Sequence, residues 1–149
     1  MATSKLFQEL LGKLPTEQFF KDFWGKNWLY LEKGNSPTQN CHISIEFLDG
    51  FFTNTRLRYP WVKLIQNGGE VPIKEYRNSK LSQLTDIIDN DKLFDKLRDG
   101  ATIIANSIDK SHGQIGVYCR ELEKELSVKI WANLYISPAK STGIGIHQD

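Results

Sequence analysis

The sequence predicts a mixed α+β fold in which helices come first and strands accumulate towards the C-terminus. Apolar residues before residue 60 recur at helical spacing, which is the main signal for amphipathic helices. From residue 61 onwards, short segments alternate apolar and polar residues or are continuously apolar, as strands do. Helices and strands do not alternate regularly along the chain, and this argues against a doubly wound α/β sheet.

Three helices are predicted in the first 60 residues. Residues 3–13 carry leucines at helical spacing, and Pro15 ends this segment. Thr16 is the expected cap of a second helix. Its apolar stripe consists of Phe19, Phe20, Phe23 and Trp24. Ser44 is the expected cap of a third helix, and the apolar run 28–31 predicts a strand between the second and third helices.

The second part of the chain is predicted to form most of the strands. A strand is predicted over residues 61–66, with Trp61, Lys63 and Ile65 on one face and the residues between them on the other. Asn67-Gly68-Gly69 is a hairpin signal that leads into a returning strand over 71–76. Pro72 places that returning strand at a sheet edge, because proline cannot donate to the ladder. Three further strands are predicted over residues 101–105, 128–136 and 144–149.

Two helices interrupt these strands. One is predicted over residues 92–98, with Asp89 or Asn90 as its cap and Gly100 at its end. The other spans about 111–126, and His112 is interpreted as a surface residue of its capping region.

The composition is that of an ordinary globular protein. Hydrophobic residues make up 40% and charged residues 25% of the 149 residues, and the formal net charge is +1. This balance argues against nucleic acid as a partner, which favours a strongly basic domain. Two cysteines without CxxC spacing are too few for a disulfide framework, and Cys119 is expected to be a buried apolar group. No apolar run reaches the roughly 18 residues of a membrane span, so we expect a cytoplasmic protein without a membrane partner.

The chemically informative motif is His147-x-Asp149. Residues i and i+2 of a strand point to the same face, so a His nitrogen and an Asp oxygen can reach one metal ion. A distant second His would complete the facial triad of non-haem Fe(II) oxygenases, which leaves coordination positions open for co-substrate and dioxygen. The pair alone is a weak signal, because an exposed strand end gives the same pattern.

Longer motifs surround this pair. Residues 131–149 read WANLYISPAKSTGIGIHQD, with an Asn-x-Tyr-x-Ser-Pro strand, a glycine-containing turn and His-x-Asp. This segment resembles the one that leads into the iron site of JmjC/cupin-like ribosomal oxygenases. Residues 97–104 (LRDGATII) and 19–31 (FFKDFWGKNWLYL) are similar to two earlier motifs of that family, in the same order. One departure is Trp28, where the family often has proline.

The resemblance implies a double-stranded β-helix, a jelly-roll-like barrel with helices packed outside it. Residues 1–149 would be the N-terminal portion of a single JmjC/cupin-like domain, with a helical layer over about 1–60 and the first barrel strands over about 61–149. Fe(II) would be held by His147, Asp149 and a later His. 2-Oxoglutarate would chelate the metal, and a Lys or Arg from a later strand would meet its far carboxylate.

Asn133 and Tyr135 lie on the strand before the metal motif and share a face with each other. The resemblance implies that both line the pocket and bond to the co-substrate or the substrate. The alternatives are that Tyr135 is a core aromatic with a satisfied hydroxyl and that Asn133 closes a turn or strand edge. Gly143 and Gly145 are assigned to the turn before the metal strand.

The function that the resemblance implies is hydroxylation of a protein or peptide side chain. We expect the distal His, the 2-oxoglutarate cation and the rest of the barrel to lie beyond Asp149, so this chain alone should turn over no substrate. Many members of the family dimerise, which implies a homodimer of the full-length protein. The alternatives are a non-catalytic cupin-like binding or interaction module and an oxygenase acting on a small molecule or a modified peptide.

A cluster of cations is the remaining candidate for a binding surface. Arg56, Arg58 and Lys63 surround Tyr59 and Trp61. This arrangement could face a peptide or a nucleic acid, but we interpret it as a solvated strand face.

Overall fold

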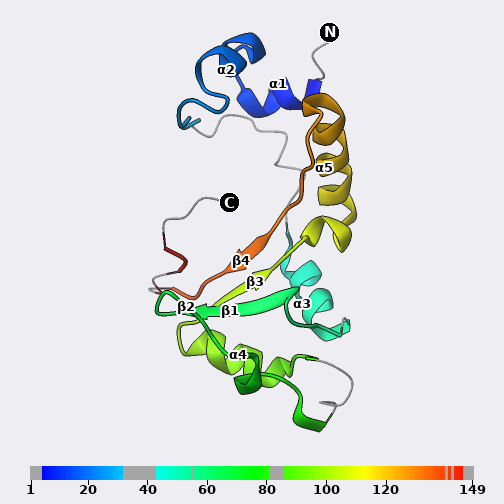
Figure 1. Ribbon diagram of the computed structural model, residues 1–149. Coiled ribbons are helices and arrows are strands. Elements are labelled where there is room, and N and C mark those ends of the chain that lie inside the picture. The colour runs from blue at the N-terminus through cyan, green and yellow to red at the C-terminus, as the bar shows by residue number, and fades with distance from the viewer. Residues whose placement is uncertain are drawn as a thin grey trace.

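The computed structural model describes residues 5–31, 43–54, 56–80, 86–139, 141 and 143–145. In these residues the chain is α+β, with five α-helices and one four-stranded antiparallel sheet, as the sequence predicts (Figure 1). The α-helices are α1 (Lys5–Leu11), α2 (Thr16–Asp22), α3 (Ile45–Asn54), α4 (Asn90–Arg98) and α5 (Gly113–Leu126). The strands are β1 (Val62–Gln66), β2 (Gly69–Glu70), β3 (Thr102–Ala105) and β4 (Leu134–Ile136), and the 3-10 helices are η2 (Ile73–Glu75) and η4 (Ile108–Lys110).

The sheet has the strand order β2-β1-β3-β4. Leu64 of β1 lies opposite Ile103 of β3, which lies opposite Ile136 of β4. The β1–β2 hairpin closes over Asn67 and Gly68, whose φ angles are 52° and 79°. Two positive φ angles are what a tight two-residue hairpin needs, so the predicted turn is confirmed.

Helices α3 and α4 cover one face of the sheet (Figure 1). Side chains alternate between the faces of a strand, so alternate residues of β1 and β3 point towards these helices. The resulting core contains Val62, Leu64, Ile103 and Ala105 from the strands and Phe51, Phe52 and Leu93 from the helices. All of these side chains are at most 9% exposed. The segment between Phe51 and Ile108 therefore supplies every fully buried member of this cluster.

Helix α5 runs from the sheet to the N-terminal helices, which lie at its far end (Figure 1). The backbone N–H of Phe7 in α1 donates to Glu125 Oε2 of α5 at 3.0 Å, and the rings of Phe7 and Phe19 meet edge to face at 5.3 Å. With 14 residues α5 is the longest described helix, and no described helix is long and apolar enough to cross a membrane.

Most predicted helix starts are confirmed by capping contacts. Ser44 Oγ accepts from the N–H of Phe47 at 3.1 Å, and the Asp89 carboxylate accepts from the N–H of Lys92 at 3.3 Å. His112 Nδ1 accepts from the N–H of Ile115 at 3.3 Å at the start of α5. Cys119 is buried, as expected.

Thr16 was expected to cap α2, and this expectation is wrong. Pro15 occupies the cap position, and Thr16 is the first helical residue. The hydroxyl of Thr16 instead donates to Gln8 Oε1 of α1 at 2.9 Å, and its side chain is buried. Thr16 therefore joins α1 to α2 rather than satisfying the start of its own helix.

Two predicted strands are absent or shorter. Residues 28–31 form no strand, and Trp28 and Tyr30 are 85% and 75% exposed, because a short apolar run cannot by itself supply a partner strand. The strand returning from the hairpin ends at Glu70, before Pro72, and residues 73–75 form η2 instead. Proline has no N–H to donate to a ladder, which accounts for this early end.

The strand predicted over 128–136 is limited to β4, residues 134–136. The segment before it is held by side chains from α5 and η4, as described below. Of the strand predicted over 144–149, residues 146–149 lie outside the described residues, and residues 144 and 145 have no strand conformation.

Burial of Tyr76 makes the stability of the folded protein depend on pH. Its ring is fully buried, and its hydroxyl lies near the backbone of Leu64 without forming a hydrogen bond of normal geometry among the described residues. Burial raises the pKa of this phenol to about 12 from its usual 10. The folded state thus retains a proton that the unfolded state releases first, so this stability is complete below pH 10 and lost as the pH rises towards 12.

We expect Tyr76→Phe to remove this alkaline loss. The free energy of unfolding at about pH 7 should stay equal or rise, because an unpaired buried hydroxyl stabilises nothing. Urea unfolding at about pH 7 and about pH 11 measures both effects. Tyr30→Phe, at an exposed tyrosine, is the matched control and should keep the wild-type pH profile. Equal alkaline slopes for Tyr76→Phe and wild type would contradict this assignment.

Candidate metal and cofactor site

His147 and Asp149, the predicted metal ligands, lie outside the described residues. What the structure describes is the strand and the turn that precede them. Within the described ranges, no three His, Cys, Asp or Glu side chains gather in a way that could hold a metal ion. The site is therefore built from β4 and its neighbours.

Strand β4 lies at the edge of the sheet. It pairs with β3 on one side and has no partner strand on the other side within the described part of the chain. An edge strand presents a row of backbone N–H and C=O groups that can pair with another strand. The sheet can therefore be extended next to β4.

The chain reverses direction after β4. The N–H of Ser141 donates to the carbonyl of Pro138 at 3.3 Å. Gly143 has a φ of +60°, and a Cβ added there would lie 3.8 Å from Ser137 Oγ. The positive φ favours glycine, so Gly143 serves the turn and returns the chain to the end of β4.

Tyr135 lies on the face of the sheet opposite α3 and α4. The register aligns it with Ile104 of β3, which is aligned with Lys63 of β1. Tyr135 is 42% exposed, so it is not a core aromatic.

Two more hydroxyl groups lie at the same end of β4. Thr102 Oγ1 and Ser137 Oγ are 2.8 Å apart, and Thr102 shares the Tyr135 face by strand alternation. Together Thr102, Tyr135 and Ser137 form what we call the hydroxyl strip. Sequence reasoning missed Thr102 and Ser137, although Ser137 follows Tyr135 by two residues, the spacing at which residues of a strand share a face.

The cation on this face is already paired. Lys63 Nζ lies 3.3 Å from Glu70 Oε2, across the β1–β2 hairpin. Hydroxyl groups can donate to the carboxylate of an organic acid, but the described part of this face offers no unpaired cation to complete such a site.

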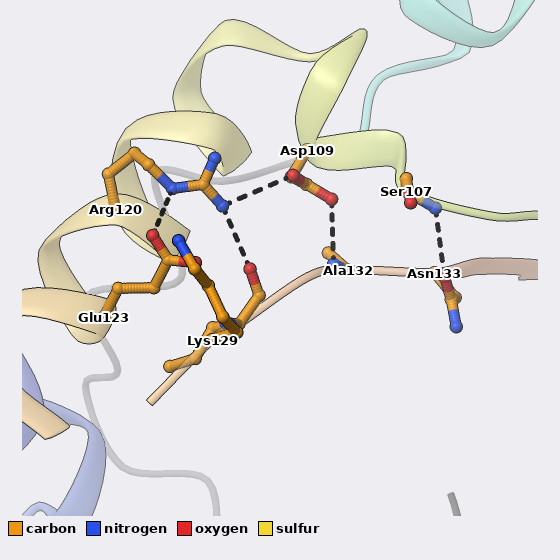
Figure 2. A network of polar contacts seen from close by, with 8 residues as sticks. Ser107, Asp109, Arg120, Glu123, Lys129, Ala132 and Asn133 are labelled. Carbon is orange, nitrogen blue, oxygen red and sulfur yellow. Dashed lines mark hydrogen bonds and ion pairs between the residues drawn. The ribbon is translucent and has the colours of Figure 1, made fainter. Parts of the chain in front are cut away.

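Asn133 has a structural contact at the other end of β4 (Figure 2). Its Oδ1 accepts from the N–H of Ser107 at 3.0 Å. Ser107 has a φ of 53° and lies in the turn between β3 and η4. Asn133 therefore holds this turn against the strand that leads into β4, and its side-chain carbonyl is already engaged.

The segment before β4 is fixed by a buried carboxylate. The Asp109 side chain is 2% exposed, and its Oδ1 accepts from the N–H of Ala132 at 3.1 Å (Figure 2). The carbonyl of Ala132 accepts from the N–H of Ile108 at 2.8 Å. Arg120 Nη2 lies 3.5 Å from Asp109 Oδ2 and supplies the opposite charge. Helix α5 approaches η4 closely at Gly116, where a Cβ would lie 2.6 Å from the carbonyl oxygen of Asp109.

Arg120 and Glu123 of α5 extend this network along the segment before β4 (Figure 2). Arg120 Nη2 donates to the carbonyl of Ile130 at 3.0 Å, and Glu123 Oε1 accepts from the N–H of Ile130 at 3.1 Å. Arg120 Nε also lies 2.7 Å from Glu123 Oε2. The hydrogen bond from Ile130, with the charges of Arg120 and Lys129, lowers the pKa of Glu123. Side chains thus satisfy backbone groups that a longer β4 would have used.

The contacts of this network join residues on different elements, so no local sequence motif predicts them. The predicted strand over 128–136 was read from its apolar residues alone. The competing partners Asp109, Arg120 and Glu123 lie on other elements, and their arrangement follows only from the packing of α5 on η4.

No protein-family model matches this chain. The resemblance to JmjC/cupin-like oxygenases therefore stays a prediction from the motifs quoted above.

We expect Asp109→Ala to lower the free energy of unfolding by about 2–3 kcal/mol, because it leaves the half-buried N–H of Ala132 without its acceptor and removes one of the two carboxylates that Arg120 contacts. Glu121→Ala is the control, since Glu121 is an exposed carboxylate on α5, and it should change stability by less than about 0.5 kcal/mol. Chemical denaturation of the three proteins measures both values. Equal losses in the two variants would show that Asp109 does not anchor this segment.

Proposed function

We propose that this chain contributes to the iron site of an Fe(II)- and 2-oxoglutarate-dependent oxygenase, with His147 and Asp149 as two of the three protein ligands. The observation that carries the proposal is the context of this pair. It follows an edge strand and a chain-reversing turn at Gly143, at the spacing that puts two strand residues on one face.

The donor types fit the metal. One imidazole and one carboxylate are two members of the facial triad that binds non-haem Fe(II). A strand added beside β4 would carry both donors on a single face. His112 is not a candidate for the third ligand, because its Nδ1 caps α5, its ring packs 4.5 Å from that of Phe47, and it does not gather with other donors. We assign the third ligand to a residue outside the described ranges.

The exposed members of the hydroxyl strip, Tyr135 and Ser137, suit the co-substrate, whereas Thr102 is buried against Ser137. 2-Oxoglutarate carries two carboxylates, and the phenol of Tyr135 can donate to one of them. Lys63 is engaged by Glu70, so we assign the cation for the distal carboxylate to a residue outside this face. When bound, Fe(II) with 2-oxoglutarate and dioxygen supplies the oxidant that hydroxylates a C–H bond, with succinate and carbon dioxide as co-products.

The proposed substrate class is a protein or peptide side chain, as in the ribosomal oxygenase branch that the motifs resemble. The alternative is a non-catalytic cupin-like binding module, which would keep the same edge strand and turn but bind no iron. Iron binding therefore separates the two functions.

The decisive experiment is an anaerobic titration of the whole protein with Fe(II) and 2-oxoglutarate, monitored by the weak visible charge-transfer band of the chelate. Wild type should develop the band, and His147→Ala and Asp149→Ala should lose it, because two ligands remain where three are needed. His112→Gln is the matched control and should keep the band. An absent band in wild type at saturating iron and 2-oxoglutarate would reject the oxygenase function and leave the binding module.

Tyr135→Phe tests the co-substrate contact. We expect 2-oxoglutarate binding to the Fe(II)-loaded protein to weaken roughly tenfold, because a hydrogen bond to a carboxylate is lost. The melting temperature should not change, since Tyr135 is 42% exposed on an edge strand. Titration of the charge-transfer band measures the affinity, and Tyr30→Phe is the control. An unchanged affinity would remove Tyr135 from the site.

A further inference from the structure

A surface hollow lies away from the hydroxyl strip. Its volume is about 260 Å³, and it opens where the end of α3, the segment before β1 and helix η4 meet. Its lining consists of Phe51, Arg56, Leu57, Arg58, Trp61, Val62, Asn106, Ser107, Lys110 and Ser111, which we call the cationic pocket. It lies at the Ala105 end of β3, whereas the hydroxyl strip begins at Thr102, the other end of that strand. The two sites are therefore separate.

The cations of this pocket form no ion pair with any described carboxylate. Arg56, Arg58 and Lys110 line it, and no acidic residue does. Within the described ranges none of the three forms an ion pair with a carboxylate, and Lys110 Nζ instead lies 5.1 Å from the centre of the Trp61 ring. Cations of one sign around a hollow with low-dielectric walls raise the local potential and attract anions.

The sequence predicts a different group of cations on this surface. Lys63 was expected beside Arg56 and Arg58, but it points to the opposite face of β1 and pairs with Glu70. Lys110, from η4, takes its place beside the arginines. Arg56 and Arg58 are solvent-exposed, as expected, but they precede β1 and line a hollow together with Lys110.

The floor of the pocket is apolar. Phe51, Leu57 and Val62 are 9%, 4% and 2% exposed, and Trp61 is 54% exposed. An exposed indole beside an apolar floor offers a flat ring a surface on which to stack. A ligand that satisfies both the cations and the indole therefore combines an aromatic ring with a negative charge.

The volume limits the size of that ligand. Pockets for drug-sized molecules measure roughly 300–1,000 Å³, and this one lies just below that range. It suits one ring and its charged group rather than a dinucleotide.

We propose that the cationic pocket binds a small single-ring aromatic anion of the aryl phosphate class. The ring packs on the apolar floor beside Trp61. The phosphate meets Arg56 and Arg58, whose planar guanidinium groups can bind its oxygens in pairs, and the Lys110 ammonium.

The probe for this proposal is phenyl phosphate, titrated into the whole protein labelled with ¹⁵N at its tryptophan indoles. Trp61→Phe assigns the Trp61 signal among the four tryptophans. We expect a saturable shift of this signal, with phenol and inorganic phosphate binding at least about tenfold more weakly, because each lacks one half of the ligand. Affinity should fall as the salt concentration rises, since the cations are exposed.

Variants separate the pocket from the general surface charge. Arg56→Gln and Lys110→Gln should each weaken phenyl phosphate binding about tenfold, the usual loss for a charge-assisted contact. Lys74→Gln is the matched control, because Lys74 is an exposed cation outside the pocket, and it should bind as wild type does. The dispersion of the amide spectrum confirms that each variant is folded.

Three outcomes would overturn the proposal. The first is the absence of a saturable shift with phenyl phosphate at millimolar concentration. The second is equal affinity for inorganic phosphate, which would make the pocket an unselective cationic surface. The third is a phosphotyrosine peptide that binds at least about tenfold more tightly than phenyl phosphate, which would make a modified protein the occupant. None of these outcomes depends on iron or 2-oxoglutarate, so they leave the proposed oxygenase function unaffected.

Discussion

The interaction on which the position of the candidate site depends is the burial of Asp109 between α5 and the segment before β4. A buried carboxylate is costly to desolvate, and it persists only where hydrogen bonds and an opposite charge offset that cost. Here the N–H of Ala132 and the guanidinium of Arg120 provide both. Because Ala132 is held on η4, residues 134–136 enter the sheet in register with β3, and the chain after Tyr135 starts from a defined position.

The fold could be predicted from the sequence where the determining contacts are local. Ser44 and Asp89 accept from N–H groups three residues along the chain, and Asn67-Gly68 closes a two-residue turn, so each signal lies within the residues that use it. The strand predicted over 128–136 is too long, because side chains from another element bond to its backbone groups. The N–H and carbonyl of Ile130 bond to Glu123 and Arg120, and this shortened β4.

The same distinction applies to the candidate sites. The His147-x-Asp149 spacing is visible in the sequence, but the exposure of Tyr135 follows from strand register, which a single segment does not specify. The cationic pocket requires η4 to bring Lys110 to the arginines that precede β1. A grouping of cations by their proximity in the sequence wrongly includes Lys63, because strand alternation places its side chain on the other face of β1.

The distribution of the core along the chain has a consequence for how the protein forms during synthesis. Every fully buried residue of the main cluster lies between Phe51 and Ile108, whereas Leu134 and Ile136 of β4 only pack against it. Polypeptides emerge from the ribosome N-terminus first and fold as units become complete. The three-strand sheet with α3 and α4 can therefore assemble before α5 and β4 are made. Strand β4, which precedes the proposed metal ligands, is added to this sheet afterwards, so its loss would remove none of the buried residues of the main cluster.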